Sequence, residues 1–152
     1  MINPPFDDIW CHPPSKDEAE ITVYGTGYGE SIVIHSGNGN WIVVDSACLG
    51  GKNNPFALRY LKILGVDFAA QVSHVVATHW DNDHIRGIAK IVRECENCCF
   101  VNSATVHTEK MFVELLAMSQ GMGKKLSRPS EILEAYYLAR ERYNTSHRPT
   151  LD

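Results

Sequence analysis

The segment from Thr78 to Gly87 constrains the fold of this chain most strongly, because it gathers ligand-type side chains between two different elements. The apolar run Val75-Val76-Ala77 precedes it and is typical of a buried strand. Apolar residues at helical spacing follow it, namely Ile85, Ile88, Ala89, Ile91 and Val92. We therefore expect a strand over 75–78, a helix over 85–94, and a site where they meet, since ligands bind at such junctions in open α/β folds.

Four side chains of this segment are candidate metal ligands: His79, Asp81, Asp83 and His84. His79 and Asp81 share one side of an extended chain, while Asp83 and His84 turn with the loop toward the same point. Two carboxylates this close repel each other unless a cation neutralises them. The mixed nitrogen and oxygen set suits Zn²⁺, Mn²⁺ or Fe, and the share of carboxylates favours Mn²⁺. The sequence thus predicts one or two divalent ions, zinc or manganese.

An alternative interpretation of the same residues needs no metal. Asp81-Asn82-Asp83 has the composition of a turn, and Asp83 is well placed to cap the following helix. The two histidines would then only be packed or solvated. A cap requires a single acceptor, however, so it explains neither histidine and leaves the second carboxylate without a role.

The pattern His-x-Asp-x-Asp-His resembles the His-x-His-x-Asp-His signature of metallo-β-lactamase fold hydrolases, with Asp81 where the second histidine usually stands. This version is similar to the hydrolase domain of ComEC-type DNA-uptake proteins. The resemblance implies that His79 and Asp81 serve one metal, that Asp83 and His84 serve the other, and that Asp83 is catalytic. Arg86 replaces the first glycine of the usual Gly-Gly pair, a departure from the family's close backbone packing at that point.

Two further segments match this family. The run Gly27-Tyr28-Gly29-Glu30-Ser31 resembles the Gly-x-Gly-Asp segment that opens the ComEC-type domain, with Glu30 in place of the aspartate. That carboxylate lies either near the metals or simply in a hairpin turn. Asp45 ends the apolar run Trp41–Val44 and matches an aspartate that orients the metal ligands without binding the metal. Alternatively, Asp45 only begins the turn through Gly50-Gly51.

Local patterns predict the remaining elements. Three short runs, 21–24, 31–35 and 41–45, are separated by glycine-bearing turns and indicate an antiparallel meander. Asn54 is expected to cap and Pro55 to open a helix that Gly65 ends. A strand over 100–102 and helices over about 109–120 and 129–143 follow. Cys95, Cys98 and Cys99 are expected to be buried thiols at a helix-to-strand junction, because a structural zinc would need four ligands.

Composition limits the class of protein. At 152 residues the chain is long enough for one domain and too short for two ordinary ones. A net charge of −4 provides no global attraction to nucleic acid, so a polyanionic substrate would have to be held locally. Five cysteines, an odd number, and no secretory leader predict thiols in a reducing cytoplasm. No run approaches the ~18 apolar residues of a membrane span.

The expected fold class is α/β (α+β), as the amino-terminal half of the αββα sandwich that the resemblance implies: one mixed sheet with covering helices. The resemblance is specific from Ile21 to Gly87. Residues 1–20 are expected to form an irregular arm, and 21–152 a domain incomplete at its carboxyl end, because no strand is predicted after Asn102. The apolar inner face of the sheet would then be open, to be covered by a dimer partner or by the missing half.

The resemblance implies a metal-dependent hydrolase, with phosphodiester bonds of DNA or RNA as the favoured target. Hydrolysis of thioester, lactone or β-lactam bonds remains open within the same class. A different class is a truncated or degenerate module without activity, which binds metal weakly or serves as an interaction piece.

Overall fold

The computed structural model describes residues 12–25, 27, 29–48, 54–79, 81–102 and 130–146. Its strands are β1 (Glu20–Gly25), β2 (Glu30–His35), β3 (Trp41–Val44), β4 (Val72–Ala77) and β5 (Cys99–Asn102). Its helices are α1 (Phe56–Ile63), α2 (Phe68–Gln71), α3 (Asn82–Ile85), α4 (Ile88–Glu94) and α6 (Ser130–Ser146). The helix predicted over 109–120 lies outside the described residues. Within those ranges no helix has the length and apolar character needed to cross a membrane.

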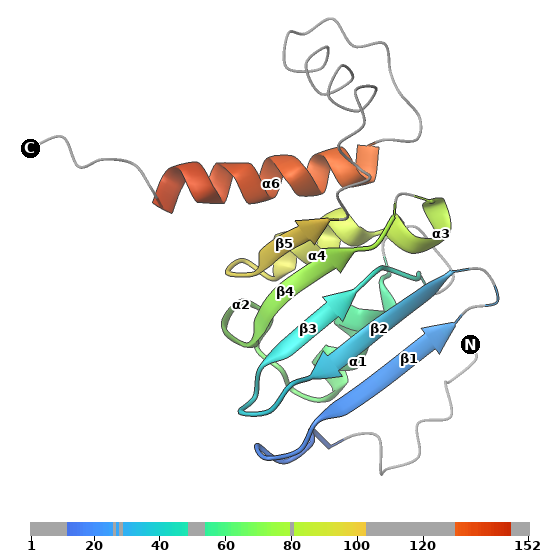
Figure 1. Ribbon diagram of the computed structural model, residues 1–152, viewed down its shortest axis with the longest axis vertical. Helices are drawn as coiled ribbons and strands as arrows, with labels where there is room; N and C mark the ends of the chain where they lie inside the picture. Colours follow the sequence, from blue (N-terminus) through green and yellow to red (C-terminus); the bar gives the residue numbers. More distant parts are fainter. Residues whose placement is uncertain are drawn as a thin grey trace, which may run out of the picture.

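The five strands form a mixed sheet in the order β1-β2-β3-β4-β5 (Figure 1). β1, β2 and β3 are antiparallel neighbours, whereas β4 runs parallel to β3 and β5 runs parallel to β4. Parallel neighbours need crossover connections, which α1 and α2 provide before β4 and α3 and α4 provide before β5. This arrangement confirms the α+β class and the antiparallel meander that the sequence predicts.

The turn between β2 and β3 adopts the backbone angles that its composition predicts. Gly37, Asn38 and Gly39 have φ values of 92°, 53° and 74°. Glycine and asparagine tolerate this left-handed region best, so the turn sets the β2–β3 register from local sequence alone.

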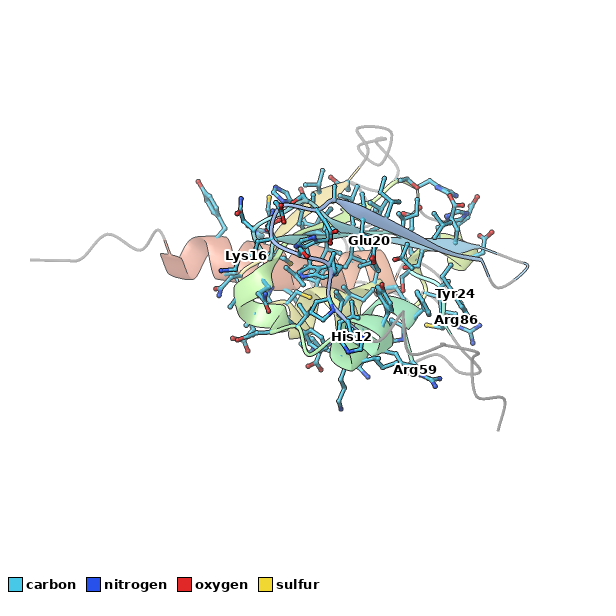
Figure 2. The ribbon with its side chains drawn as sticks, turned by 90° about the horizontal axis from the view of Figure 1, so that it is seen from below. His12, Lys16, Glu20, Tyr24, Arg59 and Arg86 are labelled. Carbon is cyan, nitrogen blue, oxygen red and sulfur yellow. The ribbon has the colours of Figure 1, made fainter. Side chains whose placement is uncertain are left out.

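One face of the sheet carries the core. Val33, Val43 and Val75 are partners across β2, β3 and β4, and each is at most 1% exposed. Helices α1 and α4 lie on this side of the sheet (Figures 1 and 2). Their buried residues, which include Leu61 and Ile91, join the same apolar cluster.

The opposite face of the sheet is apolar but open. Its residues form cross-strand rows, with Val23, Ile32, Val44, Val76 and Val101 in one row and Ile21, Ile34, Ile42, His74 and Cys99 in the other. Ile21 is 67% exposed, Val23 62% and Val101 39%. Among the described residues, no helix or strand lies over this face (Figure 1).

Helix α1 starts differently from the expectation. It begins at Phe56, and no side chain caps it, so the predicted cap by Asn54 is wrong. Instead the main-chain N–H of Phe56 donates to the carbonyl of Ala47, 2.9 Å away. A main-chain partner from the loop after β3 thus replaces the expected side-chain cap. Gly65, with φ of 71°, follows the helix as predicted.

Aromatic rings fasten α1 to the edge strand β1. Tyr24 stacks on Phe56 with ring centroids 3.7 Å apart and planes 7° from parallel, and Phe56 contacts Tyr60 at 5.8 Å. The Tyr60 hydroxyl donates to the Glu20 carboxylate over 2.7 Å. Burial raises the pKa of Tyr60 to about 12, so the phenol stays protonated and keeps donating.

The single helix predicted over 85–94 is divided into α3 and α4. Gly87 lies between them with φ of 88°, a left-handed conformation that ends one helix and begins the next. A Cβ at Gly87 would lie 2.8 Å from Cys48 Sγ and 2.9 Å from Pro55 Cγ. The close packing of this family motif therefore depends on Gly87, and the exposed side chain of Arg86 does not disturb it.

The cysteines between α4 and β5 differ from one another in burial. Cys95 is buried, as predicted, and burial raises the pKa of its thiol to about 12. Cys98 is half-buried and Cys99 is exposed, so the expectation of three buried thiols is wrong for Cys99. The reason is the strand alternation of β5, which turns Cys99 toward the open face.

Helix α6 holds α4 at both ends. Burial raises the pKa of the Glu131 carboxyl. The main-chain N–H groups of Ala89 and Gly87, at the start of α4, interact with this carboxyl and act in the opposite direction by lowering its pKa. The Arg142 guanidinium donates to the carbonyls of Cys95 and Arg93, each 3.1 Å away. The acid lies at the amino end of α4 and the base at its carboxyl end, which is the arrangement the helix dipole favours.

We expect Arg142→Met to lower the free energy of unfolding by about 1 to 3 kcal/mol, because two carbonyls at the end of α4 lose a charged donor. Urea unfolding monitored by circular dichroism measures the change.

Arg140→Met is the matched control, because Arg140 lies on the same helix and is exposed. It should change stability by no more than about 0.5 kcal/mol. Equal losses in both variants would show that Arg142 does not act through α4.

Candidate metal centre

The candidate ligands lie at the carboxyl ends of β3 and β4. Asp45 follows β3 and His79 comes shortly after β4, and these ends meet because the strands are parallel. The chain then folds back, and the Ser46 N–H donates to the carbonyl of His84 over 2.6 Å. As a result the rings of His79 and His84 face each other, with centroids 3.8 Å apart and planes at 49°.

Asp45 is the most buried of these residues, at 2% exposed. Its backbone is left-handed, with φ of 56°, and its N–H donates to the Val76 carbonyl over 2.8 Å. Its carboxylate accepts from the Thr78 N–H at 2.8 Å, the Thr78 hydroxyl at 2.6 Å and His84 Nδ1 at 3.0 Å. A buried charge is tolerated here because both of its oxygens are hydrogen-bonded.

Thr78 extends this network to the second histidine. An ionised carboxylate only accepts hydrogen bonds, so the Thr78 hydroxyl is the donor in its bond to Asp45. The same oxygen then accepts from His79 Nδ1, which lies 2.8 Å away. Both imidazoles therefore carry their proton on Nδ1, and the Nε2 atom of each retains a free lone pair.

Each Nε2 atom lies near one of the other two predicted ligands. His79 Nε2 is 3.9 Å from Asp81 Oδ2, and His84 Nε2 is 3.7 Å from Asp83 Oδ2. The side-chain exposure rises from 16% at His84 through 39% at Asp83 and 41% at His79 to 75% at Asp81. Asp81 is thus the most solvent-exposed of the four predicted ligands, and His84 is the most buried.

These residues fit a divalent cation. A neutral Nε2 and a carboxylate oxygen are both acceptors, so the two atoms repel each other unless a cation lies between them or the imidazole is protonated. Nitrogen and oxygen donors of this kind are ligands of zinc and manganese.

Among the described residues, the three whose ligand atoms all lie within 4.8 Å of one another are Asp45, His79 and His84, so the structure gathers two of the four predicted ligands with Asp45, and neither Asp81 nor Asp83 belongs to this group. The three hydrogen bonds to Asp45 leave its carboxylate little capacity for a metal. We therefore favour an orienting role for Asp45 and ligand roles for the two Nε2 atoms.

The alternative that Asp83 only caps a helix finds no support in the geometry. Asp81 occupies the N-cap position of α3 and makes no side-chain cap bond, and Asp83 lies in the first turn. Glu30 is exposed and pairs with Gly25 in the ladder, as expected of a hairpin residue.

Sequence reasoning gave no role to two residues of the site, Thr78 and Ser46. Thr78 could have been found, because a hydroxyl directly before a candidate ligand can fix the histidine's proton. Ser46 carries no comparable signal. Its hydroxyl donates to the carbonyl of Arg86 over 2.7 Å, a contact between residues that are far apart in sequence.

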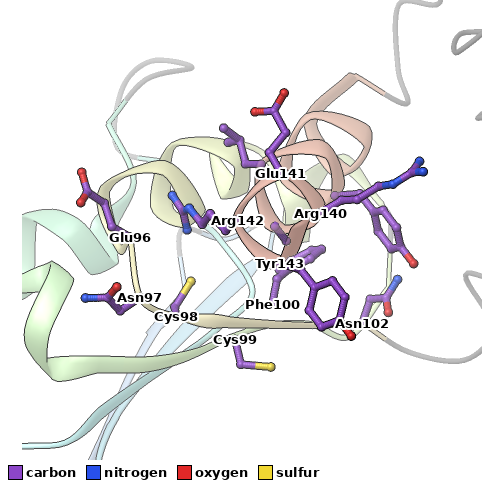
Figure 3. Close-up of a pocket in the computed structure, with 13 residues that line it drawn as sticks. Glu96, Asn97, Cys98, Cys99, Phe100, Asn102, Arg140, Glu141, Arg142 and Tyr143 are labelled. Carbon is purple, nitrogen blue, oxygen red and sulfur yellow. The ribbon is translucent and has the colours of Figure 1, made fainter. Parts of the chain in front are cut away.

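A hollow of about 1170 Å³ lies elsewhere, between β5 and the second half of α6 (Figure 3). None of the metal-site residues lines it. Arg142 points toward the turn that carries Cys98, so the hollow belongs to the attachment of α6. The candidate chemistry therefore lies in the open group of histidines and carboxylates and not in this hollow.

Comparison with known protein families gives a match to the Metallo-beta-lactamase superfamily over residues 24–147. The chain belongs to this superfamily. Its members are typically metal-dependent hydrolases, and within the described residues Asp45, His79 and His84 form a group that could hold such a metal. The sequence matches none of the curated proteins with which it was compared.

Thr78→Val should lower zinc affinity about 10- to 100-fold, because His79 loses the acceptor that holds its proton on Nδ1. Competition with a chromophoric chelator measures the affinity. Thr78→Ser keeps the hydroxyl and should bind within about threefold of the parent. If both variants bind zinc like the parent, the proposed proton arrangement is wrong.

Proposed function

We propose that this protein is a metal-dependent hydrolase that cleaves phosphodiester bonds of nucleic acid, using one or two zinc or manganese ions held by His79, Asp81, Asp83 and His84. The observation that carries the proposal is the pairing of each histidine Nε2 with its own carboxylate, Asp81 or Asp83. Two such pairs side by side suit a dinuclear centre.

Asp81 supports the choice of substrate. It supplies an oxygen donor where the family pattern has a nitrogen donor, which makes that position harder and more negative. A harder position suits manganese and phosphate oxygen chemistry better than it suits the opening of a lactam or thioester. Asp81 is also 75% exposed, so a bulky polymer can reach this side of the site.

The residues of the chain have separate tasks in the proposed reaction. Asp45 and Thr78 hold the protons of both histidines away from the metal side. A divalent ion bound there supplies Lewis acidity and lowers the pKa of water. Asp83, 39% exposed, is the proposed acceptor for the proton of the attacking water.

We place this activity in the cytoplasm because of the thiols. Cys95, Cys98 and Cys99 are free thiols within the described part of the chain. Free thiols are typical of a reducing compartment.

The protein should hydrolyse bis(p-nitrophenyl) phosphate with Mn²⁺ faster than it opens nitrocefin or a thioester. Turnover rates of the three substrates, measured under the same conditions, test this order.

His79→Ala and Asp83→Ala should each lose at least about tenfold in bound metal, measured by elemental analysis after dialysis. Retention of metal by both variants at the level of the parent would exclude these ligands.

Asp81→His should shift the metal preference from Mn²⁺ toward Zn²⁺, because a nitrogen donor replaces an oxygen donor. The ratio of the two dissociation constants is the measurement. An unchanged ratio would falsify the assignment of Asp81 as a ligand.

The open sheet face favours a second candidate, a module that is inactive until another layer covers it. Ile21 and Val23 are more than half exposed on a face whose two cross-strand rows are apolar apart from His74 and Cys99 at the end of one of them. Exposed apolar surface of this kind marks an interface or a tendency to aggregate. A further layer of protein, from a second copy of the chain or from another protein, would supply the cover.

If the second candidate is right, the 152-residue chain should self-associate in sedimentation experiments, lose metal on dialysis and show no turnover. Ile21→Lys combined with Val23→Lys should restore a monomer by charging the open face. A monodisperse monomer of the unchanged chain that retains two metals and hydrolyses the reporter would exclude this candidate.

A further inference from the structure

Gly29 lies directly against the main chain of the metal-site loop. It ends the turn between β1 and β2 and has φ of 82°. A Cβ built on it would overlap the carbonyl oxygen of Asp83 and lie 2.6 Å from the Asp83 carbonyl carbon and 2.9 Å from its Cβ. Because the overlapping atoms are backbone, no side-chain rotation can make room for a methyl group.

The segment that begins with Gly29 touches both parts of the site. Two residues further on, Ser31 is fully buried, and its hydroxyl donates to the main-chain carbonyl of Asp45 over 3.3 Å. Gly29 thus meets the loop that carries two candidate ligands, and Ser31 meets the residue that orients them. The antiparallel half of the sheet therefore contributes to a site whose ligands all come from the parallel half.

We propose that Gly29 is a positioning residue of the metal site, which works by letting the β1–β2 turn seat against Asp83 and so fixes where the Asp83 carboxylate and the His84 imidazole lie. This inference rests on the proposed metal site. A side chain at position 29 pushes the Asp83 main chain away from β2. His84 cannot follow freely, because its carbonyl accepts from the Ser46 N–H and its Nδ1 donates to Asp45.

Gly27 provides a matched control in the same turn. Its φ is 91°, so alanine is as strained there as at Gly29, yet a Cβ on Gly27 would meet no atom within 4 Å. Backbone strain therefore affects both substitutions, and only Gly29→Ala adds the collision with Asp83. The difference between the two variants isolates the contact.

The experiment compares the parent, Gly27→Ala and Gly29→Ala in zinc affinity, in the visible absorption of bound Co²⁺ and in thermal stability. Gly29→Ala should bind zinc about 10- to 100-fold more weakly than Gly27→Ala and show an altered Co²⁺ spectrum. A loss of stability common to both variants reports strain alone. Equal zinc affinities and equal spectra in the two variants would overturn the proposal.

A metal-free readout separates this inference from the proposed function. In the apoprotein, the NMR signal of the His84 Nδ1 proton bonded to Asp45 should move in Gly29→Ala and stay in place in Gly27→Ala. If the parent binds no metal but this proton moves as expected, the metal site is wrong and the positioning contact stands. If the proton does not move, the positioning role is wrong whatever the metal result.

Folding of the variants is the remaining requirement. If Gly29→Ala folds only with zinc, the zinc concentration at half-folding replaces the affinity, and a tenfold or greater difference from Gly27→Ala supports the proposal. A Gly29→Ala chain that folds at no zinc concentration, while Gly27→Ala folds, would overturn it, because the contact would then serve the fold as a whole.

Discussion

The hydrogen bonds to the Asp45 carboxylate are the interaction on which the site depends. They join the end of β3 to Thr78 after β4 and to His84 in α3, so that Asp45 is bonded to both ends of the loop that follows β4. The left-handed backbone of Asp45 costs about 1 to 2 kcal/mol, and bonds to a charged acceptor contribute about 1.5 to 3 kcal/mol each. The strained residue is therefore held by the groups that it orients.

The mixed sheet explains how these segments reach one another. The parallel pairing of β3 with β4 brings two strand ends to one edge, and the crossover through α3 returns the chain to that edge. The antiparallel β1–β2 hairpin adds Gly29 from the other side. Three different loops of one sheet therefore build the site. The loop after β4 carries the candidate ligands, the end of β3 carries Asp45, and the β1–β2 turn carries Gly29.

Sequence predicted the parts of this structure that local chemistry determines. Asn38 and its neighbouring glycines marked a turn, and the apolar run before His79 marked a strand. The start of α1 was missed because the partner of Phe56 is the Ala47 carbonyl, which is a tertiary contact. The bonds from Arg142 to the end of α4 were beyond prediction for the same reason, since no periodicity encodes a contact between distant segments.

The attachment of α6 makes the site sensitive to a part of the chain that contributes no ligand. Glu131 accepts from the N–H of Gly87, only three residues after His84, while Arg142 holds the far end of α4. Local unfolding of α6 would release both ends of α4 together and free the loop next to the ligands. Helix α6 therefore packs on α4, which begins shortly after the candidate ligand His84 in the chain.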